Sequence, residues 1–140
     1  MIEQTIERWH RVLDGDFDLL DELLADDVIF YSPVVFTPQK GKAVTRMYLG
    51  GAAKILGVDD PERPADAPRP FQYTKEILCG HHAALEFETE VGGRYVNGMD
   101  IITCDDEGRI VEFRVMIRPL QAIQVLHAEM AKLLKALQDG

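Results

Sequence analysis

Cysteine is scarce in this sequence, which contains only Cys79 and Cys104 and no zinc-like spacing of cysteine and histidine. Each cysteine lies in an apolar, strand-like run, so we expect two buried free thiols rather than a disulfide or a metal site. Free thiols are typical of a reducing compartment, and the charged N-terminal segment lacks the apolar core of a signal peptide. The sequence therefore predicts a cytoplasmic protein with no metal and no cofactor.

Basic residues are also few, with 15 Lys and Arg against 24 Asp and Glu and a formal net charge of −9. This balance argues against nucleic acid and anionic membranes as partners, because both are bound mainly through Lys and Arg at phosphate groups. No apolar run approaches the roughly 18 residues of a membrane-spanning helix. Glycine-rich phosphate loops and internal repeats are missing too. An uncharged or cationic small ligand remains open.

The composition, with 46% hydrophobic and 28% charged residues over 140 positions, is that of an ordinary globular protein. The length is that of one domain, so we expect residues 1–140 to form a single unit. Nothing in the chain resembles a linker between two domains.

Four segments show the three- and four-residue apolar spacing of amphipathic helices. The first covers residues 2 to about 13, and Asp16 is then placed to cap a second helix. A third covers residues 42–56, and Pro119 suits the first turn of a last helix. The apolar stripes of the second and last helices are Phe17, Leu20, Leu23 and Leu24, and Ile123, Leu126, Met130, Leu133 and Leu137.

The remaining regular segments are typical of strands. A short β-prone run, residues 28–31, is continued briefly by residues 34–36. An antiparallel meander is then predicted from four runs separated by turn residues, namely 71–79, 82–91, 94–104 and the segment that leads to Pro119. Between helix and meander, residues 58–70 hold four of the seven prolines. We interpret this stretch as a loop, either a simple crossover or a mobile flap at a pocket mouth.

The hairpin from Gly98 to Pro119 carries the most informative residue of the chain, Asp100. Alternation places Asp100 on one face of its strand together with Gly98, Ile102 and Cys104, opposite the row of Phe113, Val115 and Ile117 on the next strand. A carboxyl group within such an apolar row is paired, kept protonated or part of a site, because an unpaired buried charge is too costly. We therefore expect Asp100 to be buried with a raised pKa.

The order of these elements resembles the nuclear-transport-factor-2-like superfamily, in its SnoaL-like and ketosteroid-isomerase-like branch. The resemblance spans nearly the whole chain and is carried by Gly15-Asp16, Leu24-Ala25-Asp26-Asp27, Gly41 and the hairpin from Gly98-Met99-Asp100 to Arg114. It implies an α+β fold in which a cone-shaped, curved, antiparallel or mixed sheet carries three N-terminal helices on its concave face, followed by a C-terminal helix. This cystatin-like α+β cone would enclose a conical hydrophobic pocket.

Matched onto the ketosteroid isomerase pattern, Asp100 takes the place of the aspartate that stabilises the oxyanion. The isomerase's catalytic base is replaced by Ser32, and its oxyanion tyrosine by Trp9. Serine is no unassisted proton shuttle and an indole does not ionise usefully, so authentic steroid isomerisation is not expected. Strict alternation also points Arg114 away from the pocket, which argues against a hydrolase that pairs Arg with Asp.

Two functions remain open from the sequence. The first is an enzyme, an isomerase, cyclase or dehydratase that uses Asp100 for proton transfer on a small apolar molecule. The second is a non-catalytic ligand-binding or protein-interaction module with the same cone. The residues expected to bind the substrate beside Asp100 are Trp9, Tyr31, Ser32, Tyr48, Phe87, Ile102, Phe113 and Val115.

The outer face of the hairpin is too apolar for a solvated surface and predicts a homodimer. The residues that would form this face are Met99, Ile101, Thr103, Arg114, Met116 and Arg118. The last helix has three alternative positions: over this face, across to the partner, or over the cone.

Overall fold

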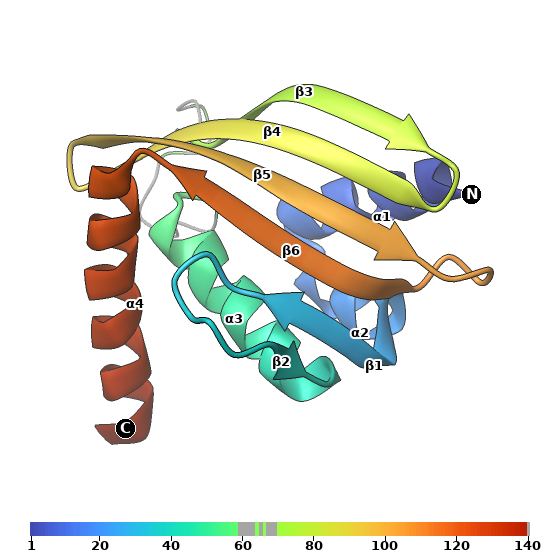
Figure 1. Cartoon of the computed structure of the whole chain (residues 1–140), viewed down its shortest axis with the longest axis horizontal. Helices are drawn as coiled ribbons and strands as arrows, with labels where there is room; N and C mark the ends of the chain where they lie inside the picture. The colour runs from blue at the N-terminus through green and yellow to red at the C-terminus, as the bar shows by residue number, and fades with distance from the viewer. Residues whose placement is uncertain (59–63, 65, 67–69, 140) are drawn as a thin grey trace.

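The computed structural model describes residues 1–58, 64, 66 and 70–139. The helical elements are α1 (Ile2–Leu13), the 3-10 turn η1 (Phe17–Leu19), α2 (Leu20–Leu23), α3 (Lys42–Ile55) and α4 (Leu120–Asp139). The strands are β1 (Leu24–Tyr31), β2 (Gln39–Lys40), β3 (Gln72–Cys79), β4 (His82–Val91), β5 (Arg94–Cys104) and β6 (Ile110–Arg118). The fold is α+β, with a curved sheet and helices packed against it (Figure 1).

The six strands form one mixed sheet in the order β2-β1-β6-β5-β4-β3. Strands β3 to β6 are the predicted antiparallel meander, whereas β1 joins the far side of β6 in parallel. The predicted bounds of β4 and β5 are confirmed. They could be predicted because the residues alternate along each strand and glycine-containing turns separate the strands. In β5 and β6, Asp100 lies opposite Val115 and Ile102 opposite Phe113, as the alternation predicts.

Helices α1, α2 and α3 lie against the concave face of the sheet, and α4 runs down from the end of β6 (Figure 1). Side chains of α1 and α2 pack into the core on this face, where Ile2, Ile6, Leu20 and Leu23 are almost fully buried. A hydrogen bond from the Thr5 hydroxyl to the Gly108 carbonyl, 2.8 Å long, ties α1 to the β5–β6 turn. Burial of these apolar side chains is the main source of stability in this layer.

The second helix is much shorter than its apolar stripe predicts. Only one 3-10 turn and one α-helical turn form, and Leu24, the last residue of the stripe, begins β1 instead. Leu24 is fully buried and pairs with Ile110 of β6, so tertiary pairing overrides the local helical pattern. Asp16 occupies the position before η1 but makes no side-chain capping hydrogen bond, and this prediction is wrong.

Residues 34–36 do not continue the first strand. The Ser32 Oγ accepts hydrogen bonds from the N–H groups of Val34 and Val35, at 3.1 and 3.2 Å, and turns the chain before the two-residue β2. Cys104 is buried as predicted, but Cys79 is exposed because β3 is the edge strand; both are free thiols. Most of the predicted loop at 58–70 lies outside the described residues.

The last helix closes the cone rather than covering the outer face of the sheet. Ala122 and Leu126 of α4 are buried against the core formed with Phe87, Val91 and Val96. Leu120, at the start of α4, stays exposed. Within the described residues, no helix combines the length and apolar character that a membrane span requires.

Candidate functional site

Asp100 lies at the centre of β5, on the concave face of the sheet. It is paired with Leu85 of β4 and Val115 of β6, and only 6% of its surface is exposed. Both neighbours are aliphatic, so the carboxyl group has no cation beside it on either strand. Its placement follows directly from the period of two along β5.

A chain of two hydrogen bonds links Asp100 to the first helix. The Tyr73 hydroxyl donates to Asp100 Oδ2 at 2.6 Å, and the Trp9 Nε1–H donates to the Tyr73 oxygen at 2.9 Å. Trp9 comes from α1 and Tyr73 from β3, so three separate elements meet at this carboxyl group. The tyrosine can therefore orient Asp100 while its own position is fixed by the indole.

Burial raises the pKa of Asp100 to about 7, and the hydrogen bond from Tyr73 partly opposes this rise. Burial, together with the nearby Asp100 carboxylate, raises the pKa of Tyr73 well above its usual value. Tyr73 thus remains a hydrogen-bond donor at neutral pH. Asp100 is poised to be a proton donor or acceptor at neutral pH, as general acid–base groups are.

Asp100 and Tyr73 line a cavity of about 50 Å³ within the cone. Apart from these two groups and the indole of Trp9, the described lining is aliphatic or aromatic. It consists of Leu13, Phe30, Leu49, Ala52, Ala53, Leu56, Val58, Phe71, Phe113 and Val115. This arrangement of a few polar groups in an apolar hollow is typical of small-molecule sites.

A second cavity of about 50 Å³ lies beside α4, which contributes Leu126 and Met130 to its lining. Ser32 and Tyr48 line this cavity and not the one at Asp100. The Ser32 oxygen already accepts the two backbone hydrogen bonds of its turn. Tyr48 stacks on Phe30 with ring centroids 5.4 Å apart.

The other predicted binding residues divide into three groups. Trp9, Phe113 and Val115 line the Asp100 cavity. Phe87 and Ile102 are fully buried in the core and line neither cavity, because neighbouring side chains cover them. The expected place of these two residues in the pocket wall is therefore corrected.

Tyr31 lies outside the cone altogether, which is a second correction. It is the last residue of β1, pairs with Arg114, and its ring lies under that guanidinium group at 4.1 Å from centroid to Cζ. Arg114 faces away from the pocket, as the alternation predicts. The two residues form a cation–π contact on the convex face.

Tyr73 is the residue of the candidate site that the sequence pattern did not reveal. Its strand is mostly exposed and has an irregular register between Tyr73 and Lys75, so it gives no clean alternation. The register that starts at Cys79 and His82 would, if continued, place Tyr73 opposite Glu88 in the outward-facing row. Only the shift brings Tyr73 opposite Phe87, whose row faces the cone, so the sequence pattern holds no signal for it. Edge-to-face contact with Phe71, at 5.0 Å between ring centroids, holds the phenol in place.

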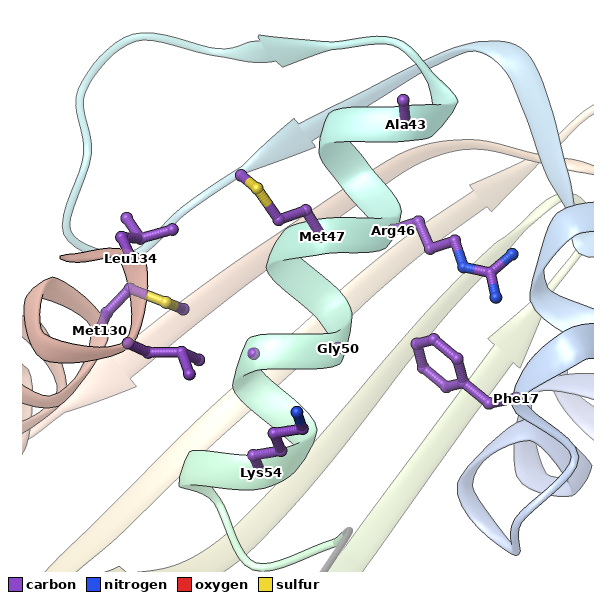
Figure 2. A pocket seen from close by; sticks show the side chains of 10 residues that line it. Phe17, Ala43, Arg46, Met47, Gly50, Lys54, Met130 and Leu134 are labelled. Carbon is purple, nitrogen blue, oxygen red and sulfur yellow. The ribbon is translucent and has the colours of Figure 1, made fainter. Parts of the chain in front are cut away.

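The largest of the described hollows is elsewhere, in an open groove of about 490 Å³ between α3 and α4. Figure 2 shows the side chains of Met47, Lys54 and Met130 along this groove, with Arg46 and Phe17 at its other edge. Arg46 is already paired with Asp21 and lies 3.8 Å from Asp18. The groove has no buried titratable group, so its size alone does not make it the candidate site.

No protein-family model matches the sequence, and no curated protein does either. Solved structures do match. A steroid delta-isomerase from Pseudomonas aeruginosa is 32% identical, with a TM-score of 0.87, over 99% of this chain and 95% of that one. An uncharacterized protein with a cystatin-like fold from Silicibacter pomeroyi is 30% identical, with a TM-score of 0.78, over 94% and 85%. A nuclear-transport-factor-2-like protein of unknown function from Mesorhizobium loti is 23% identical, with a TM-score of 0.62, over 84% and 93%.

A conical sheet with helices on its concave face and these similarities together define the class of protein. The chain belongs to the nuclear-transport-factor-2-like superfamily, which has the cystatin-like fold. The same fold occurs in isomerases and in cyclase-like enzymes. Fold alone does not fix a reaction, so the function is argued from the site.

Proposed function

We propose that this protein binds a small apolar molecule with one carbonyl or hydroxyl oxygen and that Asp100 transfers a proton to or from it. The observation that carries this proposal is the carboxyl group of Asp100, buried in an apolar cavity and hydrogen-bonded by Tyr73. With a pKa of about 7, it is present in both protonation states at neutral pH. The rest of the described lining is apolar, and polar interactions with a ligand are stronger in such surroundings than in water.

The proton chemistry follows from the two states. The protonated carboxyl donates a hydrogen bond or a proton to a carbonyl oxygen, and the carboxylate accepts a proton from a neighbouring hydroxyl or carbon. Among the described residues, Asp100 is the only carboxyl group that lines either cavity. Reactions in which one group both delivers and removes the proton fit this site best: isomerisation, cyclisation or dehydration.

The relative named as a steroid delta-isomerase supports isomerisation as the reaction class. A different substrate is supported by Ser32, which stands where the ketosteroid isomerase pattern has its base and whose oxygen is engaged in a turn. Trp9 supplies an N–H donor to Tyr73 rather than to the cavity. We therefore propose an acid–base site that differs from the steroid-isomerising one.

The test pairs ligand binding with turnover. Small ketones are titrated against the intrinsic fluorescence of Trp9, the one tryptophan of the chain, and β,γ-unsaturated ketones are followed by the absorbance of the conjugated product. Asp100→Asn should keep the fold and abolish turnover, because the amide keeps the shape but does not exchange a proton in this role. Asp27→Asn, at an exposed position in β1, is the matched control. Unchanged turnover in Asp100→Asn would refute the proposal.

A second candidate is a non-catalytic ligand-binding or protein-interaction module. It is favoured by the cavity volumes, since about 50 Å³ is far below the roughly 300 Å³ of ordinary small-molecule pockets. In this case ligands would bind and Asp100→Asn would lower their affinity, but neither protein would turn over unsaturated ketones, enols or epoxides. Product analysis after prolonged incubation distinguishes the two candidates.

We also propose that the chain forms a homodimer through the convex face of the sheet. Met116 is 51% exposed there, beside half-buried Met99 and Ile101, which is unusual for a solvated surface. Met116→Glu should separate the dimer, and Gln124→Glu on exposed α4 is the control. Sedimentation at micromolar concentration measures the result, and a parent protein that sediments as a 15.8 kDa monomer would refute dimerisation.

The proposal includes a cytoplasmic location and no cofactor. Cys79 and Cys104 are free thiols, which suits a reducing compartment. Among the described residues, no group of three or more His, Cys, Asp or Glu side chains is placed to hold a metal ion. Activity that survives exhaustive chelation and dialysis would agree with this expectation, and loss restored by a metal would contradict it.

A further inference from the structure

The two cavities of the cone are neighbours with a common wall. Four residues line both of them: Phe30 of β1, Ala52 of α3, Leu56 directly after α3, and Val115 of β6. We propose that the two cavities are the two ends of one binding site for an elongated ligand, with its single oxygen at Asp100 and an apolar chain directed toward α4. This inference rests on the proposed function and adds the shape of the ligand and the residues that limit its length.

The polarity of the two ends differs. The first cavity offers the Asp100 carboxyl and the Tyr73 hydroxyl. The second is lined mainly by carbon, from Pro33, Val34, Ile55, Ile117 and Leu126 among others. Its two polar side chains are Ser32, whose oxygen is held by its turn, and Tyr48, whose ring stacks on Phe30. A molecule with one oxygen-bearing end and one hydrocarbon end matches this order, because a polar group in the second cavity would lose its hydrogen bonds.

The volumes explain why one cavity is not enough. About 50 Å³ is only a few times the roughly 10–15 Å³ of cavity volume that a single water needs. A ligand of more than a few heavy atoms at Asp100 therefore extends past the common wall. Of the four residues in this wall, Ala52 has the smallest side chain, so a larger residue there would add most to the wall.

Helix α4 closes the far end. Leu126 and Met130 line the second cavity, and Met130 also lines the open groove between α3 and α4 (Figure 2). Methionine is unbranched and adapts its shape readily, so the end wall is compliant there. Side chains at these two positions of α4 thus set the length of chain that the cone accepts.

The experiment titrates a series of straight-chain 2-alkanones, from 2-butanone to 2-dodecanone, against Trp9 fluorescence. Trp9 lines the first cavity and donates its hydrogen bond to Tyr73, so it reports on the ketone end of every member. In the parent protein, affinity should rise about fourfold for each added methylene until the second cavity is filled, and then level off.

Two variants block the path at different points. Ala52→Leu thickens the common wall, so the rise should stop at shorter chains, with the longest ketones bound at least tenfold more weakly than by the parent. Leu126→Phe fills the far end and should stop the rise later than Ala52→Leu does. Ala43→Leu makes the same change on the exposed, groove-facing side of α3 and should leave the whole series unchanged. Far-ultraviolet circular dichroism shows that each variant is folded.

The outcomes separate the inference from the proposed function. The elongated site is wrong if long ketones bind both variants as tightly as they bind the parent, or if affinity levels off at the shortest ketones. In either case, binding at Asp100 still stands. A series in which no ketone changes the fluorescence of Trp9 overturns both. If Ala52→Leu does not fold, Leu126→Phe, which lies on a different helix, tests the inference alone.

Discussion

The concave and convex faces of strands β5 and β6 are built from alternate residues of the same two segments, yet their chemistry differs. On the concave face, Asp100 is buried among apolar neighbours and its pKa is raised to about 7. On the convex face, Glu112 lies 3.3 Å from the Arg114 guanidinium group and both are partly solvated. Desolvation without a compensating cation is what raises the pKa of the Asp100 carboxyl group toward neutral pH.

The largest difference between the faces should appear in stability. Phe113 is 1% exposed on the concave face and packs on Trp9 with ring centroids 5.1 Å apart. Phe113→Ala should lower the free energy of unfolding by about 3–5 kcal/mol, through lost burial and the cavity left behind. Ile77→Ala, at a convex-face position that is 57% exposed, should cost less than about 1 kcal/mol. Urea denaturation measures both, and equal losses would contradict the comparison.

The second largest effect expected from the buried carboxyl group of the concave face is a pH dependence of stability. Between about pH 4 and pH 7, the folded protein keeps a proton on Asp100 that the unfolded chain has released, because the pKa is raised from 3.8 to about 7. The free energy of unfolding should therefore fall as pH rises through this window, by about 4 kcal/mol in total at 1.36 kcal/mol per unit, and this group adds no change above it.

Asp100→Asn should remove this slope, whereas Asp27→Asn on the exposed part of β1 should keep it. Denaturation curves at closely spaced pH values measure the slope. Subtracting the curve of Asp100→Asn from that of the parent removes the contribution of the other groups. A difference that shows the parent gaining stability from pH 4 to pH 7 would contradict the raised pKa.

A smaller effect is expected from crowding on the concave face. A Cβ atom at Gly98 would lie 2.2 Å from the Phe87 ring and 2.8 Å from Ile117 Cδ1. Gly98→Ala should cost about 1–3 kcal/mol, because this part of the core has no room to relax. Gly50→Ala in α3 meets only ordinary contact with Phe17, 3.4 Å away, and should stabilise the helix by about 0.5–1 kcal/mol. Thermal unfolding of the pair should show shifts of opposite sign.

The smallest expected effect concerns the tuning of Asp100 itself. The hydrogen bond from Tyr73 lowers the pKa of Asp100, so Tyr73→Phe should raise this pKa further. Tyr95→Phe, on the convex face of the same sheet, should leave it unchanged. Carboxyl-carbon NMR titration measures both. A lower pKa of Asp100 in Tyr73→Phe would mean that the phenol does not stabilise the carboxylate.

The sequence predicts this fold where local pattern and tertiary packing agree. Strands β4 and β5 have clean alternation and glycine turns, and their bounds match. The stripe that ends at Leu24 has helical spacing too, but pairing with Ile110 draws its last residue into the sheet, and no local rule reveals that partner.

The same distinction holds for the site. Asp100 could be predicted because the alternation along its own strand shows that its side chain faces the apolar side. Tyr73 could not, because the irregular register of β3 hides its direction and its partner is 27 positions away. The course of the cavities also depends on how α3 and α4 pack, which side-chain periodicity does not specify.

The parallel pairing of β1 with β6 has a consequence for how this protein is made. Phe30 pairs with Phe113, and the Thr5 hydroxyl bonds to Gly108, 103 positions along the chain. Contacts of such separation form slowly, because the loop between them must be closed first. On the ribosome, the apolar faces of α1 and β1 emerge long before their partner strand exists. The emerging N-terminal third must therefore wait, with its future core surface uncovered, until the last hairpin has been synthesised.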